Sequence, residues 1–101
     1  MPRPRRALPR DHVQTWPGEA TGIAEVDVAR GLAINLREAM NGRSGRKVGD
    51  DTGVDFSTIN AILSGSTWPE AHTIARLEVQ LGTDLWPAGV ARASKKSTLD
   101  S

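Results

Sequence analysis

Apolar side chains in the first half of the chain recur at steps of three and four residues, which is the spacing of one face of an α-helix. They predict a helix over about residues 23–40, with Thr21 as its N-cap. Asn41-Gly42 ends this helix in the prediction, because glycine readily takes the left-handed backbone conformation beyond a helix end. The apolar face consists of Ile23, Val26, Ala29, Ala33, Leu36 and Met40.

Three further helices and a last helical turn are predicted between residues 44 and 87. Each has a residue suited to the first turn of a helix and a residue that stops it. The predicted starts are Ser44, Asp55, Pro69 and Thr83 or Asp84, and the predicted ends are Thr52-Gly53, Ser64-Gly65, Leu81-Gly82 and Pro87. No strand candidate is longer than a few residues. The pattern therefore predicts an all-α fold, a compact bundle of about five short helices.

Size and composition limit what such a bundle can do. The chain has 101 residues, no cysteine and two histidines that are far apart, His12 and His72. This length supports one core without a separate cofactor domain, and a zinc site with thiolate ligands is excluded. Asp50 and Asp51 are adjacent, so on a helix they point about 100° apart and do not converge as a catalytic pair. We expect no enzyme activity, no cofactor, no metal and no small-molecule ligand.

Charge is distributed unevenly along the chain, although the formal net charge is only +1. Residues 1–20 hold four arginines against two acids, residues 21–87 six cations against nine acids, and residues 88–101 three cations against one acid. Both ends lack apolar periodicity, so we expect a flexible basic arm over 1–20 and a disordered polar, basic tail over 88–101. Neither a secretory signal nor an apolar run of membrane-spanning length is present, which favours a soluble cytoplasmic protein.

Residues 45–65 have the spacing of two short helices that cross at a steep angle. Gly49 supplies a small residue at the crossing, and Gly53 supplies a turn residue that can take positive φ. Apolar residues close the wedge between the two helices from both sides. They are Val48, Val54, Ile59 and Ile62. This combination indicates a helix-turn-helix.

The same segment resembles the lambda-repressor-like (Cro-like or XRE-type) family of helix-turn-helix DNA-binding domains, over about residues 30–87. The positions that carry the resemblance are Gly49, Gly53-Val54, Ser57-Thr58-Ile59, Ile62, Gly65, Pro69, Thr73-Ile74, Leu77 and Leu81-Gly82. Two positions depart from the family pattern: Thr52 replaces a larger apolar residue, and Leu63 stands where many members have glutamate. The resemblance implies a transcriptional regulator, most simply a repressor, whose helix over 56–64 enters the major groove.

The outer face of that helix carries small side chains with little hydrogen-bonding capacity. On a helical wheel Ile59, Ile62 and Leu63 form the buried side. The opposite side consists of Ser57, Asn60, Ala61 and Ser64. Asn60 can pair with adenine and Ala61 can touch a thymine methyl, whereas Phe56 either leans on the core or contacts DNA. The expected base contacts are Phe56, Ser57, Asn60 and Ala61. Without Arg, Lys or Gln on this helix, a preference for A·T steps and for DNA shape is expected.

Affinity must then come from contacts with the phosphate backbone. The start of the preceding helix offers free N–H groups and the positive end of the helix dipole. The expected phosphate contacts are Arg43, Ser44, Gly45, Arg46 and Lys47 at that start, and Ser64, Ser66 and Thr67 around Gly65. Arg3, Arg5 and Arg6 form a candidate arm along the minor groove or the backbone. Such contacts release counterions, so binding should be strongly salt-dependent.

Two functions remain open on the sequence. The first is a sequence-specific regulator of double-stranded DNA, a monomer or weak homodimer, of the kind found in phages or mobile elements. The alternative is a helix-turn-helix protein-interaction module, antitoxin-like or associated with a polymerase, and the acidic middle of the chain favours it. The position of the charges distinguishes them. A DNA binder gathers Arg43, Arg46 and Lys47 beside Ser57 and Ala61, whereas a surface dominated by Asp50, Asp51 and Asp55 favours the alternative.

Overall fold

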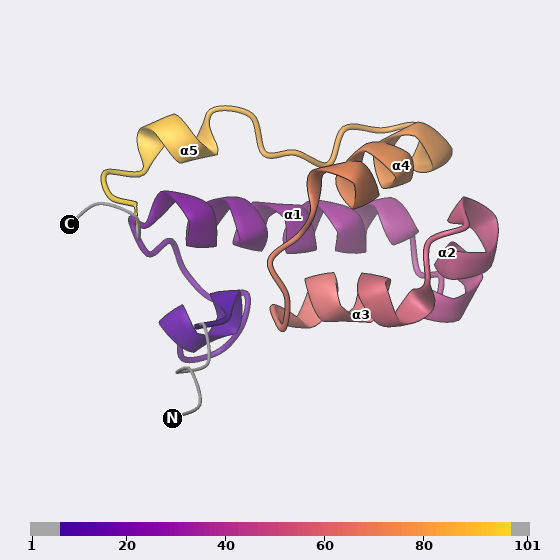
Figure 1. Cartoon of the computed structure of the whole chain (residues 1–101), viewed down its shortest axis with the longest axis horizontal. Helices are drawn as coiled ribbons and strands as arrows, with labels where there is room; N and C mark the ends of the chain where they lie inside the picture. The colour runs from indigo at the N-terminus through magenta and orange to yellow at the C-terminus, as the bar shows by residue number, and fades with distance from the viewer. Residues whose placement is uncertain (1–6, 98–101) are drawn as a thin grey trace, which may run out of the picture.

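The computed structural model describes residues 7–97, which form five α-helices and one short 3₁₀-helix (Figure 1). In chain order they are η1 (Pro9–His12), α1 (Ala24–Met40), α2 (Gly45–Thr52), α3 (Phe56–Ser64), α4 (Ala71–Leu81) and α5 (Val90–Ala93). These residues contain no strand, only an isolated bridge between Ile23 and Lys96. The predicted all-α class is confirmed. No helix within 7–97 combines the length and the apolar character that a membrane crossing requires.

The predicted ends of α2 and α3 are confirmed. Ser44 Oγ accepts the N–H of Lys47 at 3.1 Å, and Asp55 Oδ1 accepts the N–H of Ser57 at 3.2 Å. Gly53 and Gly65 follow the two helices with φ of 76° and 69°. Such a backbone strains residues with a Cβ, so glycine ends both helices at these positions.

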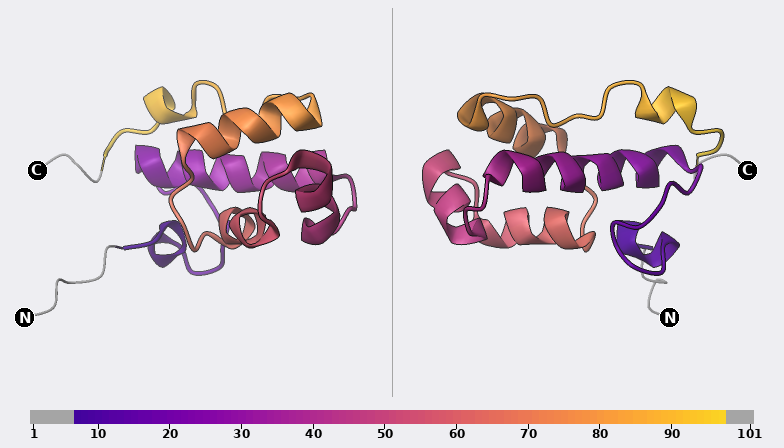
Figure 2. Two further views of the ribbon diagram at one scale, coloured as in Figure 1. Left: turned by 45° about the vertical axis from the view of Figure 1, so that its right-hand side comes forward. Right: turned by 180° about the vertical axis from the view of Figure 1, so that it is seen from behind.

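α1 runs through the middle of the molecule, and the other elements lie on two sides of it. Figure 2 shows α3 and η1 on one side of α1, and α4 and α5 on the other, in both views. α2 closes the end at which α1 and α4 finish (Figure 1). The core between these helices consists of Val28, Leu32, Leu36, Met40, Val48, Val54, Ile59, Ile62, Ile74, Leu77 and Leu85.

Thr52 is buried in this core, at a position where the family pattern has a larger apolar side chain. Its hydroxyl donates to the Val48 carbonyl at 2.7 Å and accepts the N–H of Val54 at 3.2 Å. A buried hydroxyl with both partners carries no unsatisfied hydrogen-bonding group. Thr52 thus closes the end of α2 and the turn that follows, in place of apolar packing.

Two predicted helix starts are wrong. α1 begins after Ile23, which makes no side-chain cap. Thr21 instead donates its hydroxyl to Asp27 and accepts the N–H of Ile23. α4 begins after Glu70, whose extended backbone (φ −97°, ψ 144°) leaves Pro69 outside the helix.

The predicted last turn at Leu85-Trp86 is also wrong, because no helix forms there. Glu78 Oε2 accepts the N–H of Leu85 at 2.8 Å and the N–H of Trp86 at 3.0 Å. These two hydrogen bonds to a carboxylate on α4 hold the segment as a loop, and the loop places Leu85 in the core. The fifth helix, α5, lies later in the chain.

The expected disorder of the two ends differs from the structure within the described residues. η1 lies in the segment 7–20 and α5 in the segment 88–97, and both pack against α1. The Lys96 carbonyl accepts the N–H of Ala24 at 2.7 Å, and the Lys96 N–H donates to the Gly22 carbonyl at 3.0 Å. Order here comes from partners distant in sequence, which leave no local periodicity to detect.

Candidate nucleic-acid interface

α3 presents small side chains on the side that faces away from the core. Ser57, Asn60 and Ser64 are exposed and Ala61 is half-buried. Figure 1 shows α3 along the lower edge of the molecule, with α1 above it. The predicted base contacts therefore lie together on an accessible helix face, whose narrow side chains allow a close approach of DNA.

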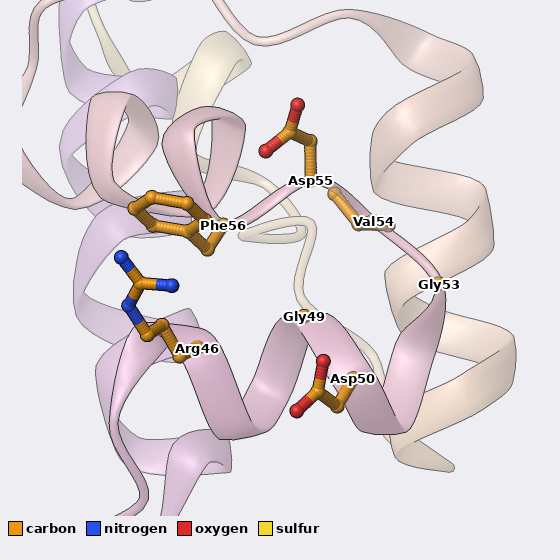
Figure 3. A pocket seen from close by; sticks show the side chains of 7 residues that line it. All are labelled: Arg46, Gly49, Asp50, Gly53, Val54, Asp55 and Phe56. Atoms are coloured by element: carbon orange, nitrogen blue, oxygen red, sulfur yellow. The ribbon is translucent and has the colours of Figure 1, made fainter.

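Phe56, at the start of α3, is 37% exposed and packs against a cation. The guanidinium carbon of Arg46 lies 4.4 Å from the centroid of its ring, a favourable cation–π distance. Figure 3 shows Arg46 reaching from α2 to this ring across a hollow of about 340 Å³, with Asp50 and Asp55 along its edge. Phe56 and Arg46 thus lie side by side on the edge of the hollow between α2 and α3.

The turn between α2 and α3 is tight because Gly49 has no side chain. A Cβ at this position would lie 2.9 Å from the Val54 carbonyl oxygen, closer than such atoms approach in proteins. Gly49 therefore has the role that the sequence predicts for it, that of a small residue where the two helices cross. Its effect is to bring the first turn of α2 alongside α3.

A second hollow, of about 330 Å³, lies between the end of α1, the start of α2 and the middle of α3. Its lining is Arg37, Met40, Arg43, Ser44, Gly45, Asn60, Leu63 and Ser64. A Cβ on Gly45 would lie 2.6 Å from Asn60 Oδ1, so the two helices are in contact here. The predicted phosphate contacts Ser44, Gly45 and Ser64 therefore share one hollow with the predicted base contact Asn60.

Arg37 also lines this hollow, although the sequence pattern did not predict it as a contact. It is exposed, and none of the ion pairs between described residues involves it. The sequence did offer a sign of this: Arg37 lies in the last turn of α1, one turn before Asn41-Gly42 ends the helix. A cation there lies beside the start of the next helix when the connection is short.

Two of the predicted phosphate-binding cations already have partners in the protein. Arg43 donates to the carbonyls of Ala39 and Met40, at 2.9 and 2.8 Å, and thereby covers the end of α1. It also pairs with Asp51 at 3.1 Å, while Lys47 pairs with the other oxygen of Asp51 at 2.9 Å. The hydrogen bond from Lys47, followed by that from Arg43, lowers the pKa of Asp51 below its ordinary value. Asp51 thus offsets part of the positive charge at the start of α2.

The hydroxyl groups after α3 form a small cluster. Ser64 Oγ and Ser66 Oγ are 3.0 Å apart, and both lie near the Ala61 carbonyl oxygen, at 3.3 and 3.4 Å. Thr67 is half-buried, and its hydroxyl contacts the Trp68 carbonyl at 3.5 Å. Among the three predicted contacts, Ser64 is exposed and Ser66 is half-buried beside it.

The cations and acids around α2 and α3 are nearly balanced. Arg37, Arg43, Arg46 and Lys47 face Asp50, Asp51 and Asp55 in the same region. The predicted arm residues Arg3, Arg5 and Arg6 lie outside the described part of the chain. The charges alone therefore favour neither of the two functions that the sequence leaves open, and the shape of the α2–α3 unit becomes the stronger criterion.

A family model described as helix-turn-helix matches residues 34–85, just over half of the chain. The matched region spans the end of α1, all of α2, α3 and α4, and every residue that lines the hollow at the start of α2. No curated protein and no solved structure gave a match.

Proposed function

Because this chain belongs to the lambda-repressor-like helix-turn-helix family, we propose that it binds double-stranded DNA sequence-specifically and represses transcription by occupying its site. The observation that carries the proposal is the hollow in which α2 begins against Asn60 of α3. There a helix N-terminus, two hydroxyls and Arg37 surround the side chain best able to pair with a base. Such a repressor acts on the nucleoid, in the cytoplasm.

In this proposal α3 lies in the major groove and supplies the sequence readout. Asn60 pairs with adenine, Ser57 accepts or donates at a base edge, and Ala61 packs against a thymine methyl. Phe56 contacts the groove wall while its ring stays on Arg46. Since the face has no bidentate guanine reader, A·T steps and groove shape supply the preference.

The start of α2 holds a phosphate. The first N–H groups of a helix have no partner within the helix, and only that of Lys47 is taken by the Ser44 side chain. The N–H groups of Gly45 and Arg46 are therefore available beside the positive end of the dipole. Arg37 adds a cation that no ion pair of the described residues uses.

The remaining predicted contacts act in different ways. Arg46 keeps the edges of its guanidinium open while its face rests on Phe56, so it reaches a phosphate at the groove entrance. Arg43 and Lys47 contribute only when DNA phosphate replaces Asp51 as their partner. Ser64, Ser66 and Thr67 bind the backbone at the far end of α3, and Arg3, Arg5 and Arg6 add an arm whose contacts are independent of sequence.

Selection of bound duplexes from a random DNA pool at two salt concentrations tests the proposal. An A·T-rich motif should be enriched, and its symmetry separates a monomer from a dimer on two half-sites about one helical turn apart. Retention that yields no motif would contradict sequence-specific readout and leave backbone binding alone.

Variants on the selected duplex then separate the two kinds of contact. Ser57→Ala and Asn60→Ala should relax the sequence preference. Arg46→Ala should weaken all duplexes alike and flatten the dependence of log K on log salt by about one unit. Arg92→Ala on α5 is the matched control, because it removes an exposed arginine from the opposite side of α1. Equal losses on every duplex from both classes would contradict this assignment of roles.

Binding to a protein is the second candidate function. Asp50 and Asp55 along the hollow beside Phe56 favour it, because they place negative charge where a DNA strand would approach. If no duplex is retained even at low salt, an antitoxin-like or polymerase-associated role gains the support that DNA binding loses.

A further inference from the structure

Residues 7–16 lie outside the matched family region, yet they dock against the carboxyl end of α3. The N–H of Arg10 donates to the Gly65 carbonyl at 3.1 Å. The indole N–H of Trp16 donates to the Leu63 carbonyl at 3.0 Å, and that of Trp68 donates to the Ala7 carbonyl at 2.8 Å. Three bonds thus tie the segment to the last turn of α3 and to the loop behind it.

Close packing at Gly65 supports the same docking. A Cβ on Gly65 would lie 2.5 Å from Cδ2 of the Trp16 ring and 3.0 Å from the Arg10 Cβ. Gly65 is buried although it follows an exposed helix end, and Pro9, which precedes Arg10 in the chain, is fully buried. Gly65 therefore serves both the helix end and this contact, and the segment is held by packing as well as by hydrogen bonds.

Arg10 itself remains exposed, and it takes part in no ion pair within the described chain. The Arg10 backbone lies against Gly65, and Gly65 is flanked in the sequence by Ser64 and Ser66. Figure 1 shows η1 and α2 at opposite ends of α3, and Figure 2 shows η1 on the same side of α1 as α3. The start of α2 lies beside Asn60 in the middle of α3, and the Arg10 backbone lies at the carboxyl end of α3.

We propose that Arg10 binds a DNA phosphate beyond the carboxyl end of α3, and that Trp16 is the positioning residue that holds it there. This inference rests on the proposed function. A cation fixed by its backbone loses less freedom on binding than one on a flexible arm, so more of the electrostatic attraction appears as affinity. The site extends the footprint on the backbone without reading any base.

Titration of a selected duplex with Arg10→Ala over a range of salt concentrations tests the site. One phosphate contact contributes a slope of about 0.9, so binding should fall roughly five- to tenfold near 0.1 M salt and recover toward wild type near 1 M. The enriched sequence should stay the same. Arg92→Ala is again the control, and it should leave both affinity and slope unchanged.

Trp16→Ala tests the positioning role. It should reduce the salt slope as Arg10→Ala does, and the double variant should bind no worse than the single ones, because both remove the same contact. A merely structural role for Trp16 would lower affinity without this change of slope. Phosphate ethylation interference should show one phosphate that matters for wild type and not for Arg10→Ala.

The outcomes separate this site from the proposed function. If Arg10→Ala matches wild type in affinity and slope while Arg46→Ala does not, the Arg10 site is refuted and DNA binding through α3 stands. If wild-type protein binds no duplex at low salt, both are refuted.

Discussion

Asp27 joins three segments of the chain, and replacing it with asparagine should destabilise the fold. Its side chain is buried, with the residue only 4% exposed. Oδ1 accepts the N–H and the hydroxyl of Thr21, at 2.8 and 2.9 Å, and Oδ2 accepts the N–H of Gly22 at 3.0 Å and the hydroxyl of Ser94 at 3.1 Å. Arg30 lies 3.6 Å from Oδ1. In Asp27→Asn, an NH₂ group replaces one of the two carboxylate oxygens, and this group donates hydrogen bonds where the oxygen accepted them.

The size of the loss follows from which donors can find another acceptor. The Ser94 hydroxyl also contacts the Val90 carbonyl at 3.0 Å, so it retains a partner. The N–H groups of Thr21 and Gly22, both half-buried residues, have no second acceptor among the described residues, and a donor that loses its acceptor away from water costs about 1–3 kcal/mol. With the loss of charge assistance in the remaining bonds, we expect a decrease of about 2–4 kcal/mol in the free energy of unfolding.

The dependence on pH identifies the carboxylate as the cause. Burial raises the pKa of Asp27, but the hydrogen bonds from Thr21, Ser94 and Gly22 outweigh it, so the pKa lies below its ordinary value of 3.8. The unfolded chain then binds the proton at higher pH than the folded chain. The stabilisation is present above the unfolded pKa and is lost as pH falls through the folded one. The difference between wild type and Asp27→Asn should therefore narrow below pH 3.8.

Urea unfolding followed by tryptophan fluorescence, from pH 7 down to pH 3, measures both effects. Each kcal/mol also lowers the melting temperature by about 4–8 °C in a domain of this size. Asp50→Asn is the control, because Asp50 is exposed and carries the same change of charge. A loss at pH 7 no larger than that of the control, or a loss that stays constant into acid, would refute this role of Asp27.

Two further predictions concern other carboxylates. Asp51→Asn should release Arg43 and Lys47 to bind phosphate. DNA binding should then tighten by up to about tenfold near 0.1 M salt and depend more steeply on salt concentration. Weaker binding of the variant in a salt titration would contradict this. Glu78→Ala removes the acceptor of both the Leu85 and the Trp86 N–H and should lower the melting temperature by about 4–8 °C for each hydrogen bond lost. An unchanged melting temperature in calorimetry would show that the loop holds its position without Glu78.

The elements that the sequence predicts accurately are those whose ends are decided locally. Ser44 and Asp55 cap N–H groups within three residues of themselves. Gly53 and Gly65 end helices through their own backbone conformation. The predicted contacts at the start of α2 and on α3 come together for the same reason, since a tight turn at Gly49 leaves few ways to arrange two short helices.

What the sequence hides depends on partners distant along the chain. Trp16 is bonded to Leu63, 47 residues away, and nothing near Trp16 in sequence shows that it packs beneath the end of a helix. Charge patterns mislead in a similar way. The sequence around Arg43 shows no partner for it. In the folded chain, however, its guanidinium pairs with Asp51, eight residues later in α2. Arg10 looks like part of a flexible arm until its backbone bond to Gly65 is known.

An NMR titration of isotope-labelled protein with a selected duplex asks directly which surface meets the DNA. If α3 reads the groove, the backbone amides of Ser57, Asn60 and Ala61 should shift most, together with Gly45 at the start of α2. The amides of α4 and α5, on the far side of α1, should change little. Shifts confined to α4 and α5, with α3 unchanged, would contradict recognition of DNA through the helix-turn-helix.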